Sequence, residues 1–392
     1  MLLPLLFLCL LSLASGQSIE GRWYAAVALP TGDKAFFVLA LERQGGGWQG
    51  TFVNGPDRNI SSSGRVDGRK LRLEFNYWDG VLEAELKGGK LEGAFTRQYR
   101  KETRIRPFVA QRTPLTKATA APGASVEGEW IFNVERKDGK EFWLAAFRQN
   151  NNKIEGTLIP VSGDYGTLTG WIENRTLLLS RFDGIRATVL KARVNPDGST
   201  EGTIDADRFR GRRPNGFGQL PDATTYTRMK NPREPFRFSF PDLHGGKVSS
   251  ADERFAGKVV IVTITGSWCP NCHEEAPLLA ELYESYRNRG LEIVALGFEY
   301  TGERERDLRQ LRLFAEKHKI KYPVLLAGTT ENATEMLGQL ENFRAYPTTL
   351  FIGRDGVVRR IHAGFDGPAT GERHIRLKKE MTEFVEKLLA EK

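Results

Sequence analysis

The sequence predicts a multi-domain protein in which two tandem antiparallel β-meander repeats, each a barrel or a sandwich, precede an α/β domain. Three observations support this fold class. The chain of 392 residues is long for one domain. Its first 230 residues contain an internal repeat, and alternating strand and helix patterns begin only after residue 235. We therefore expect β repeat 1 at residues 17–115, β repeat 2 at 124–230 and the α/β domain at 236–392.

The internal repeat has an offset of about 105 residues, which is one small domain per copy. Residues 19–23 (IEGRW) return as 126–130 (VEGEW), and residues 78–80 (WDG) return as 182–184 (FDG). Apolar and polar side chains alternate along short segments such as 71–77, 81–86 and 185–194, which Gly, Asn and Asp bound. This alternation predicts an antiparallel meander with one face toward water.

Roughly seven or eight strands per copy close into a small barrel or stack as a sandwich, since either arrangement protects the sheet edges. We expect a filled barrel or sandwich that serves as a spacer or docking surface. The alternative is a ligand-holding barrel, because the Gly-x-Trp opening of each copy resembles that of lipocalin-like barrels. Residues 117–125, rich in Ala, Pro and Gly, separate the copies, and residues 231–235 (NPREP) end the second one.

The C-terminal part alternates strands and helices. Continuous apolar strands are expected at 259–265 and 291–298, with a helix between them at 269–289. The other expected elements are a helix at 304–318, a strand at 322–326, a helix at 331–340, a hairpin of 348–353 and 357–362, and an amphipathic helix at 372–390. Together they predict an α/β sandwich around a central mixed sheet.

The first 16 residues form an apolar segment ending in Ala-Ser-Gly, which is typical of a signal peptide. We expect an exported, periplasmic protein, with this segment acting as an anchor if it is not cleaved. No later stretch approaches the roughly 20 apolar residues of a membrane span. The net charge of +8 comes from 57 Lys and Arg interleaved with 49 Asp and Glu, which argues against a nucleic-acid partner. Peripheral membrane contact stays compatible with this charge.

Residues 268–272 (WCPNC) directly follow the first apolar strand and carry the functional prediction. Cys9 lies in the leader and only Cys269 and Cys272 remain, which excludes a structural disulfide framework. A helix that begins at Cys269 places its sulfur over unpaired N–H groups and the positive end of the helix dipole, which stabilise a thiolate. We predict that Cys269 is the exposed attacking thiol and that Cys272 resolves the mixed disulfide.

Four further segments carry a family resemblance, namely residues 240–243 (FPDL), 257–260 (GKVV), 275–277 (EAP) and 346–349 (YPTT). With the cysteine motif, they resemble exported thioredoxin-fold proteins, and most closely the TlpA/ResA-like thiol-disulfide oxidoreductases of the redoxin and AhpC/TSA superfamily. The resemblance covers about residues 236–392 and leaves the repeats unexplained. It implies an enzyme without cofactor or metal that acts on protein disulfides or thiols and receives electrons from a membrane donor.

The resemblance also assigns roles to residues around the cysteines. Pro347 matches the proline that follows a cis peptide bond and faces the cysteine pair in this fold. This arrangement leaves the backbone of Tyr346 free to pair with an extended substrate. Trp268 and Thr348 complete the substrate-binding set that we expect.

Three residues of the following helix are interpreted individually. Glu275 matches a family acidic residue, and partial burial there would raise its pKa and suit proton exchange with Cys272; a surface position is the alternative. His273 is expected to point into solvent. Asn271 brings no positive charge into the motif, which favours a reductase over a strongly oxidising enzyme.

Three other functions compete with a reductase of protein disulfides. A zinc site needs about four ligands, and five scattered histidines offer no second spaced pair. A peroxiredoxin-like thiol peroxidase with antioxidant activity shares the fold, but that family has Thr and Pro where this chain has Gly266 and Val262. In the third alternative, the repeats bind a ligand or partner and the α/β domain is redox-inert. The cysteine pair, Pro347 and Glu275 argue against it.

Overall fold

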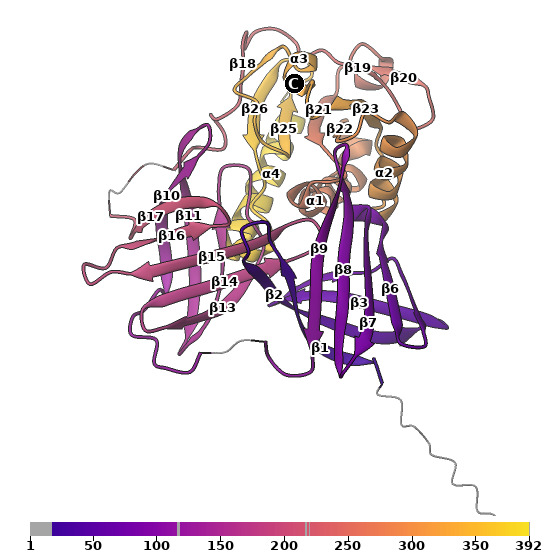
Figure 1. The fold of residues 1–392 in the computed structure, drawn as a ribbon. Coiled ribbons are helices and arrows are strands. Elements are labelled where there is room, and N and C mark those ends of the chain that lie inside the picture. Colours follow the sequence, from indigo (N-terminus) through magenta and orange to yellow (C-terminus); the bar gives the residue numbers. More distant parts are fainter. Residues whose placement is uncertain (1–17, 116–117, 216–217, 219, 392) are drawn as a thin grey trace, which may run out of the picture.

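The computed structural model describes residues 18–115, 118–215, 218 and 220–391. Figure 1 shows two β bodies side by side and an α/β domain packed against both. The predicted signal peptide at residues 1–16 lies outside the described residues. Among the helices in the described ranges, none is long and apolar enough to span a bilayer.

The first β body, repeat 1, is one nine-stranded antiparallel sheet with the order β4-β3-β2-β1-β9-β8-β7-β6-β5. The sheet curls until its two ends approach, since a Cβ added to Gly64 on β5 would lie 2.3 Å from the carbonyl oxygen of Trp48 on β3. Its interior is aromatic, with Phe52 stacked on Phe75 at 4.4 Å. The strands are β1 Gly21–Ala28, β2 Lys34–Gln44, β3 Gly47–Asn54, β4 Asp57–Ile60, β5 Ser63–Asp67, β6 Lys70–Phe75, β7 Gly80–Lys87, β8 Lys90–Tyr99 and β9 Glu102–Gln111.

The second β body, repeat 2, is a closed eight-stranded antiparallel barrel. Trp130, Phe132 and Phe209 fill its interior, and the two phenylalanine rings stack at 4.2 Å. This packing favours the filled barrel over the ligand-holding one. The strands are β10 Gly128–Arg136, β11 Gly139–Asn150, β12 Lys153–Ile159, β13 Leu168–Glu173, β14 Thr176–Phe182, β15 Ala187–Val194, β16 Thr200–Ile204 and β17 Asp207–Arg212.

Both repeats use the Gly-x-Trp opening in the same way, which confirms the duplication. The indole N–H of Trp23 and that of Trp130 each donate at 2.8 Å to the carbonyl oxygen four residues earlier. An arginine just after the last strand of each repeat covers the indole, Arg112 at 3.9 Å and Arg213 at 4.0 Å from the ring centroid. The tryptophan therefore closes the start of each repeat onto its end.

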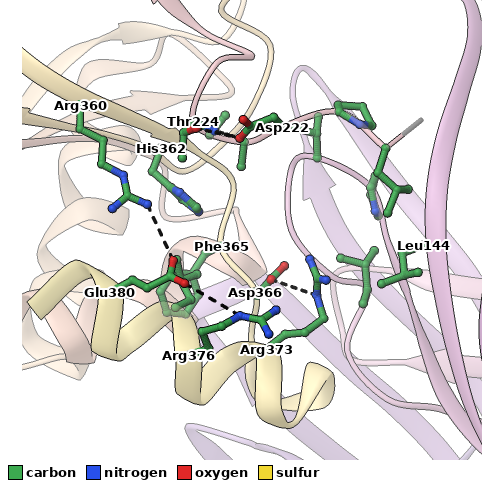
Figure 2. Close-up of a pocket in the computed structure, with 18 residues that line it drawn as sticks. Leu144, Asp222, Thr224, Arg360, His362, Phe365, Asp366, Arg373, Arg376 and Glu380 are labelled. Atoms are coloured by element: carbon green, nitrogen blue, oxygen red, sulfur yellow. Dashed lines mark hydrogen bonds and ion pairs between the residues drawn. The ribbon is translucent and has the colours of Figure 1, made fainter. Parts of the chain in front are cut away.

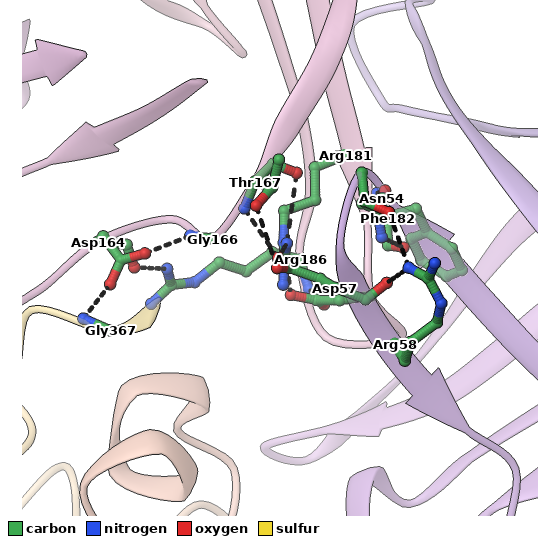
Figure 3. Close-up of polar contacts among 12 residues, drawn as sticks. Asn54, Asp57, Arg58, Asp164, Gly166, Thr167, Arg181, Phe182, Arg186 and Gly367 are labelled. Atoms are coloured by element: carbon green, nitrogen blue, oxygen red, sulfur yellow. Dashed lines mark hydrogen bonds and ion pairs between the residues drawn. The ribbon is translucent and has the colours of Figure 1, made fainter. Parts of the chain in front are cut away.

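Repeat 2 completes the core of repeat 1. Phe182, at the end of β14, is 1% exposed and belongs to the apolar cluster of repeat 1. The buried amide of Asn54 fixes it, because its Nδ2 donates to the Phe182 carbonyl at 2.8 Å and its Oδ1 accepts from the Phe182 N–H at 3.0 Å. Beside it, the Asp57 carboxylate forms an ion pair with Arg181 and accepts from the N–H of Thr167 at 2.8 Å (Figure 3). The two repeats therefore form one packed unit.

The third body is a thioredoxin-like α/β domain with the sheet order β23-β22-β21-β25-β26. Strands β21, β22 and β23 are parallel, whereas β25 runs antiparallel to both of its neighbours, β21 and β26. On β21, Val259 and Ile261 pack against helices α1 and α4, while Val260 and Val262 pack against the opposite cluster. The elements are β19 Ser239–Pro241, β20 Lys247–Ser249, β21 Val259–Thr265, α1 Pro270–Tyr286, β22 Leu291–Glu299, α2 Arg304–Lys317, β23 Val324–Thr329, α3 Ala333–Met336, β25 Thr348–Ile352, β26 Val358–Ala363 and α4 Glu372–Ala390.

One predicted helix is wrong in extent. The segment 331–340 contains only the four-residue helix α3. After it, the short strand β24 Leu340–Glu341 pairs with β18 Arg228–Met229. The last strand of the barrel ends at Arg212, so residues 228–229, expected in repeat 2, belong to a linker that packs on the α/β domain. Leu337 and Leu340 are buried, so their burial in the turn after α3 and in β24 accounts for the apolar spacing read as a longer helix.

Candidate active site

The cysteine motif lies where the buried strand β21 turns into helix α1. Cys269 is the N-cap residue and Pro270 occupies the first turn, where its missing N–H costs no hydrogen bond. The Cys272 N–H donates to the Cys269 Sγ at 3.2 Å. The Cys269 Sγ in turn donates to the carbonyl oxygen of Tyr346 at 3.4 Å. Both cysteines are free thiols.

The expectation of an exposed Cys269 is wrong for this conformation. Cys269 is 2% exposed and Cys272 is 1% exposed. Both belong to an apolar cluster with Phe314 of α2, and the part-buried rings of Trp268 and Tyr346 pack against it. The position of Cys269 at the helix start is as expected, but neighbouring aromatic rings cover the sulfur.

Glu275 lies on the inner side of α1 and is 1% exposed, so the surface alternative is wrong. Its two carboxyl oxygens accept from Thr263 Oγ1 at 2.8 Å and from Thr349 Oγ1 at 2.5 Å. Burial raises the pKa of Glu275 to about 7, although the two threonine hydroxyls oppose this shift. Burial also raises the pKa of Cys272 well above its usual range, with smaller contributions from Cys269 and Glu275.

The loop before β25 faces the cysteines from the other side. The Tyr346–Pro347 peptide bond is cis, as the family resemblance implies. Thr348 is fully buried, and its Oγ1 donates to the Ala345 carbonyl at 2.8 Å, so its side chain is engaged within the loop. Tyr346 and Trp268 remain part-exposed, and their ring centroids lie 5.1 Å apart.

Comparisons with known proteins agree with this geometry. The sequence profile of the AhpC/TSA family matches residues 233–361. The thioredoxin-like protein YneN of Bacillus subtilis is 32% identical over 127 residues, which cover 32% of this chain and 68% of YneN. The thiol-disulfide oxidoreductase ResA of Bacillus cereus is 32% identical over 136 residues, which cover 34% of this chain and 70% of ResA. The chain belongs to the ResA-like thiol-disulfide oxidoreductases. It is therefore an oxidoreductase enzyme of the protein-disulfide type.

Among solved structures, a thioredoxin-family thiol:disulfide interchange protein from Chlorobium tepidum is similar to part of the chain. It is 22% identical, and the match covers 41% of this chain and 98% of that protein with a TM-score of 0.32. The family match begins at residue 233, after both β repeats. The contacts of the repeats with the ResA-like domain are therefore features of this chain outside the family match.

Repeat 1 packs against the ResA-like domain beside α2. Asp79 forms an ion pair with Arg306 at 3.0 Å, and Arg306 contacts the fully buried Glu299 at 3.4 Å. Glu299 accepts from the N–H and Oγ of Ser267, both at 2.7 Å, directly before the motif. Burial raises the pKa of Glu299 to about 7, and the Ser267 hydrogen bonds and Arg306 oppose this shift.

The expectation of a solvent-facing His273 is wrong. His273 is 7% exposed, because Trp78 of repeat 1 lies edge-on to its ring at 4.2 Å. Its Nδ1 is 2.7 Å from the His318 Nε2, and its Nε2 is 2.8 Å from the carbonyl oxygen of Ser267. Burial and the nearby Lys317 lower the pKa of both histidines, that of His318 to about 3.

Repeat 2 contacts the motif itself through Asn271, which is 1% exposed. The Asn271 Nδ2 donates to the carbonyl oxygen of Asp164 at 2.9 Å, and its Oδ1 accepts from Arg186 at 3.2 Å. The sequence alone shows Asn271 within the motif but indicates neither of these partners. The repeated WDG and FDG segments were the available signal, since Trp78 and Asp79 belong to the first and Arg186 follows the second.

Two cavities border this part of the ResA-like domain. One, of about 720 Å³, lies between repeat 2 and the loop before Pro347, and its lining includes Tyr346, Phe343, Trp143 and Tyr165. This volume is within the usual range for ligand pockets. The other, of about 290 Å³, lies between repeat 2, the linker and α4, with Arg360, His362 and Arg373 on its walls (Figure 2). The larger cavity lies beside the cysteines, because Tyr346 lines it and the Tyr346 carbonyl oxygen accepts from the Cys269 Sγ.

Proposed function

We propose that the protein reduces protein disulfides through Cys269 and Cys272. The Cys269 thiolate attacks one sulfur of a substrate disulfide, the S–S bond breaks, and the other substrate sulfur leaves and takes up a proton. Cys272 then loses its proton and attacks the Cys269 Sγ, so the mixed disulfide breaks and the second substrate thiol leaves. Two electrons move to the substrate, and the pair ends as a Cys269–Cys272 disulfide.

Glu275 is the proposed proton acceptor for Cys272. A carboxyl with a pKa of about 7 exchanges protons near neutral pH, and the high pKa of Cys272 keeps this thiol protonated until a base acts on it. Pro347 holds the facing loop, and Tyr346 and Trp268 are the proposed substrate contacts. Because both rings pack against the cysteine cluster, we expect one of them to move when a substrate reaches Cys269.

The observation that carries this proposal is the pairing of a free Cys269 at the N-cap with a free Cys272 whose N–H it accepts. Gly266 supports a reductase over a peroxidase. A Cβ at this position would lie 2.3 Å from the Trp268 Nε1 and 2.8 Å from the carbonyl oxygen of Phe298, which leaves no room for the threonine of peroxiredoxins. Export, a disulfide-bonded protein substrate and re-reduction by a membrane-bound dithiol donor complete the proposal.

Single-cysteine variants test the assignment of roles. With a model protein disulfide, we expect Cys269→Ser to fall to the uncatalysed rate. We expect Cys272→Ser to accumulate a mixed disulfide between Cys269 and the substrate, visible by mass spectrometry. A Cys269→Ser protein that reduces the substrate as fast as the parent contradicts the proposal.

A further inference from the structure

The middle of the redox motif is held by a different domain from the one that carries the cysteines. Asn271 lies between Cys269 and Cys272, and all four of its polar contacts are fixed within the protein. Its Nδ2 donates to the carbonyl oxygens of Asp164 at 2.9 Å and Phe365 at 3.4 Å, and lies 3.5 Å from the Glu274 Oε2. Its Oδ1 accepts from the Arg186 Nη2 at 3.2 Å.

The loop of repeat 2 after β12 packs closely against Asn271 and against the segment after β26, and at two positions in this contact only a glycine fits. A Cβ on Gly163 would lie 2.4 Å from the Phe365 carbonyl oxygen and 2.7 Å from the Asn271 Nδ2. A Cβ on Gly364 would lie 2.1 Å from the carbonyl oxygen of Val161. The contact is therefore made by closely packed backbones and is not a loose surface encounter.

Arg186 is itself firmly placed. Its backbone N–H donates at 2.7 Å to the Asp183 Oδ1, which also accepts from the N–H of Ile185 at 2.8 Å. Its guanidinium donates to the Asp164 carbonyl at 3.3 Å (Figure 3). It also lies 4.8 Å from the ring centroid of Tyr165. This half-buried cation consequently has one orientation, with a donor aimed at the motif.

We propose that Arg186 is a positioning residue of the redox motif: it holds the turn between the cysteines through Asn271, and its charge favours the reduced pair. The reduced pair can carry a thiolate whereas the disulfide is neutral, so a cation beside the motif stabilises the reduced form. The motif alone brings no such charge, since Pro270 and Asn271 are neutral. Arg186 therefore makes the pair a milder reductant than the neutral motif alone predicts. Repeat 2 is then a functional part of the active site, an inference that rests on the proposed function.

The reduction potential of the Cys269–Cys272 pair tests this proposal in the full chain. We expect Arg186→Gln to lower the equilibrium constant for reduction about tenfold in defined thiol buffers, which corresponds to about 30 mV toward more negative potential. Arg193→Gln is the matched control, because Arg193 is an exposed arginine on β15 of the same barrel, and we expect less than a twofold change. An Arg186→Gln potential equal to that of this control overturns the proposal.

Two further variants separate positioning from charge. We expect Arg186→Lys, which keeps the charge, to show less than half of the Arg186→Gln shift. In an Asn271→Ala background we expect Arg186→Gln to change the equilibrium constant less than threefold, and a full tenfold change there overturns the role of Asn271. If Arg186→Gln does not fold, the reduction potentials of Arg186→Lys and Asn271→Ala test the proposal instead. The proposal is rejected if both variants have the same potential as the parent protein.

The same titration distinguishes a failure of the proposed function from a failure of the proposed role of Arg186. A parent protein whose cysteine pair does not cycle between dithiol and disulfide rejects the proposed function itself. A parent pair that cycles and reduces a small disulfide, but ignores every change at Arg186 and Asn271, rejects only the role of repeat 2.

Discussion

The two β repeats present the same sequence segment to the active site but contact it differently. In repeat 1, Asp79 of the WDG segment pairs with Arg306, and the path to the motif continues through Glu299 and Ser267. In repeat 2, Asp183 of the FDG segment holds the backbone of Arg186, whose side chain reaches Asn271 inside the motif. The first contact therefore runs through charged residues of the ResA-like domain, whereas the second is direct.

The two copies of this duplicated β domain therefore have different tasks, although both are antiparallel meanders. Repeat 1 covers residues beside the motif through two edge-to-face ring pairs, Trp78 with His273 and Tyr99 with Tyr300. Repeat 2 supplies hydrogen bonds at the centre, and it also supplies Phe182 to the core of repeat 1. At the contacts with the ResA-like domain, we expect variants in repeat 1 to change stability and access, and variants in repeat 2 to change redox chemistry. Phe182 of repeat 2 is a separate case, because it belongs to the core of repeat 1.

The largest effect on stability is expected from Phe182→Ala. Phe182 is 1% exposed, and its ring lies within 5.1 Å of those of Phe37, Phe52 and Phe95. Removing a buried phenylalanine costs about 4 kcal/mol through lost transfer energy and the cavity left behind. Hydrogen exchange followed by mass spectrometry should show faster exchange in repeat 1, although the substitution lies in repeat 2.

Phe209→Ala is the matched control, because this ring packs on Phe132 inside repeat 2. It should accelerate exchange in repeat 2 first. If Phe182→Ala leaves exchange in repeat 1 unchanged, repeat 1 has a complete core of its own and the two repeats are not one packed unit.

A somewhat smaller loss is expected when the contact of repeat 1 is broken at Arg306. Asp307 is 1% exposed and lies 3.1 Å from the Arg306 guanidinium, so Arg306→Met leaves this buried carboxylate without its cation, at a cost of about 3 kcal/mol. Urea unfolding measures the loss, and Arg309→Met on the exposed face of α2 provides the comparison, with an expected change below about 0.5 kcal/mol. Equal stabilities of the two variants would show that the ion pairs of Arg306 contribute little.

The two contacts should also respond to pH with opposite signs. Burial lowers the pKa of His273 and His318, so the folded state binds fewer protons than the unfolded state below about pH 6.5, and stability falls as the pH falls toward about 3. At the contact of repeat 2, burial raises the pKa of Asp164 and of Glu274, so the folded state binds more protons and stability falls as the pH rises through their range.

Urea unfolding as a function of pH separates these contributions in two variants. His318→Gln should reduce the loss of unfolding free energy at acidic pH. Glu274→Gln should reduce the loss of unfolding free energy as the pH rises. Identical profiles for both variants and the parent would mean that neither cluster is linked to folding.

Spacing and periodicity predicted much of the fold because they report contacts within an element. The strand at 259–265 and the helix at 372–390 were predicted with the bounds found for β21 and α4. The cis bond at Pro347 and the burial of Glu275 followed from the family resemblance.

The missed features all depend on contacts between distant segments. Asn271 lies 107 residues from Asp164 and 85 from Arg186 in sequence, and no local pattern connects such positions. Cys269 and His273 were expected to be exposed because a helix read alone has a solvent face. Neighbouring rings and repeat 1 cover that face in the folded chain.

The smallest expected effect concerns access to Cys269 past repeat 1. The Tyr99 ring, at the end of β8, lies 4.9 Å from that of Tyr300, which stacks on Trp268 at 4.4 Å. An aromatic pair contributes about 0.5 to 1.5 kcal/mol, so Tyr99→Ala should raise the population of opened conformations roughly 2- to 10-fold. The rate of Cys269 alkylation by iodoacetamide should rise by the same factor, while the reduction potential stays at its parental value. Tyr24→Ala, on β1 of the same repeat beside Arg22, should leave both quantities unchanged. A Tyr99→Ala variant that shifts the potential instead of the alkylation rate would place redox control in repeat 1 and reverse the division of tasks between the repeats.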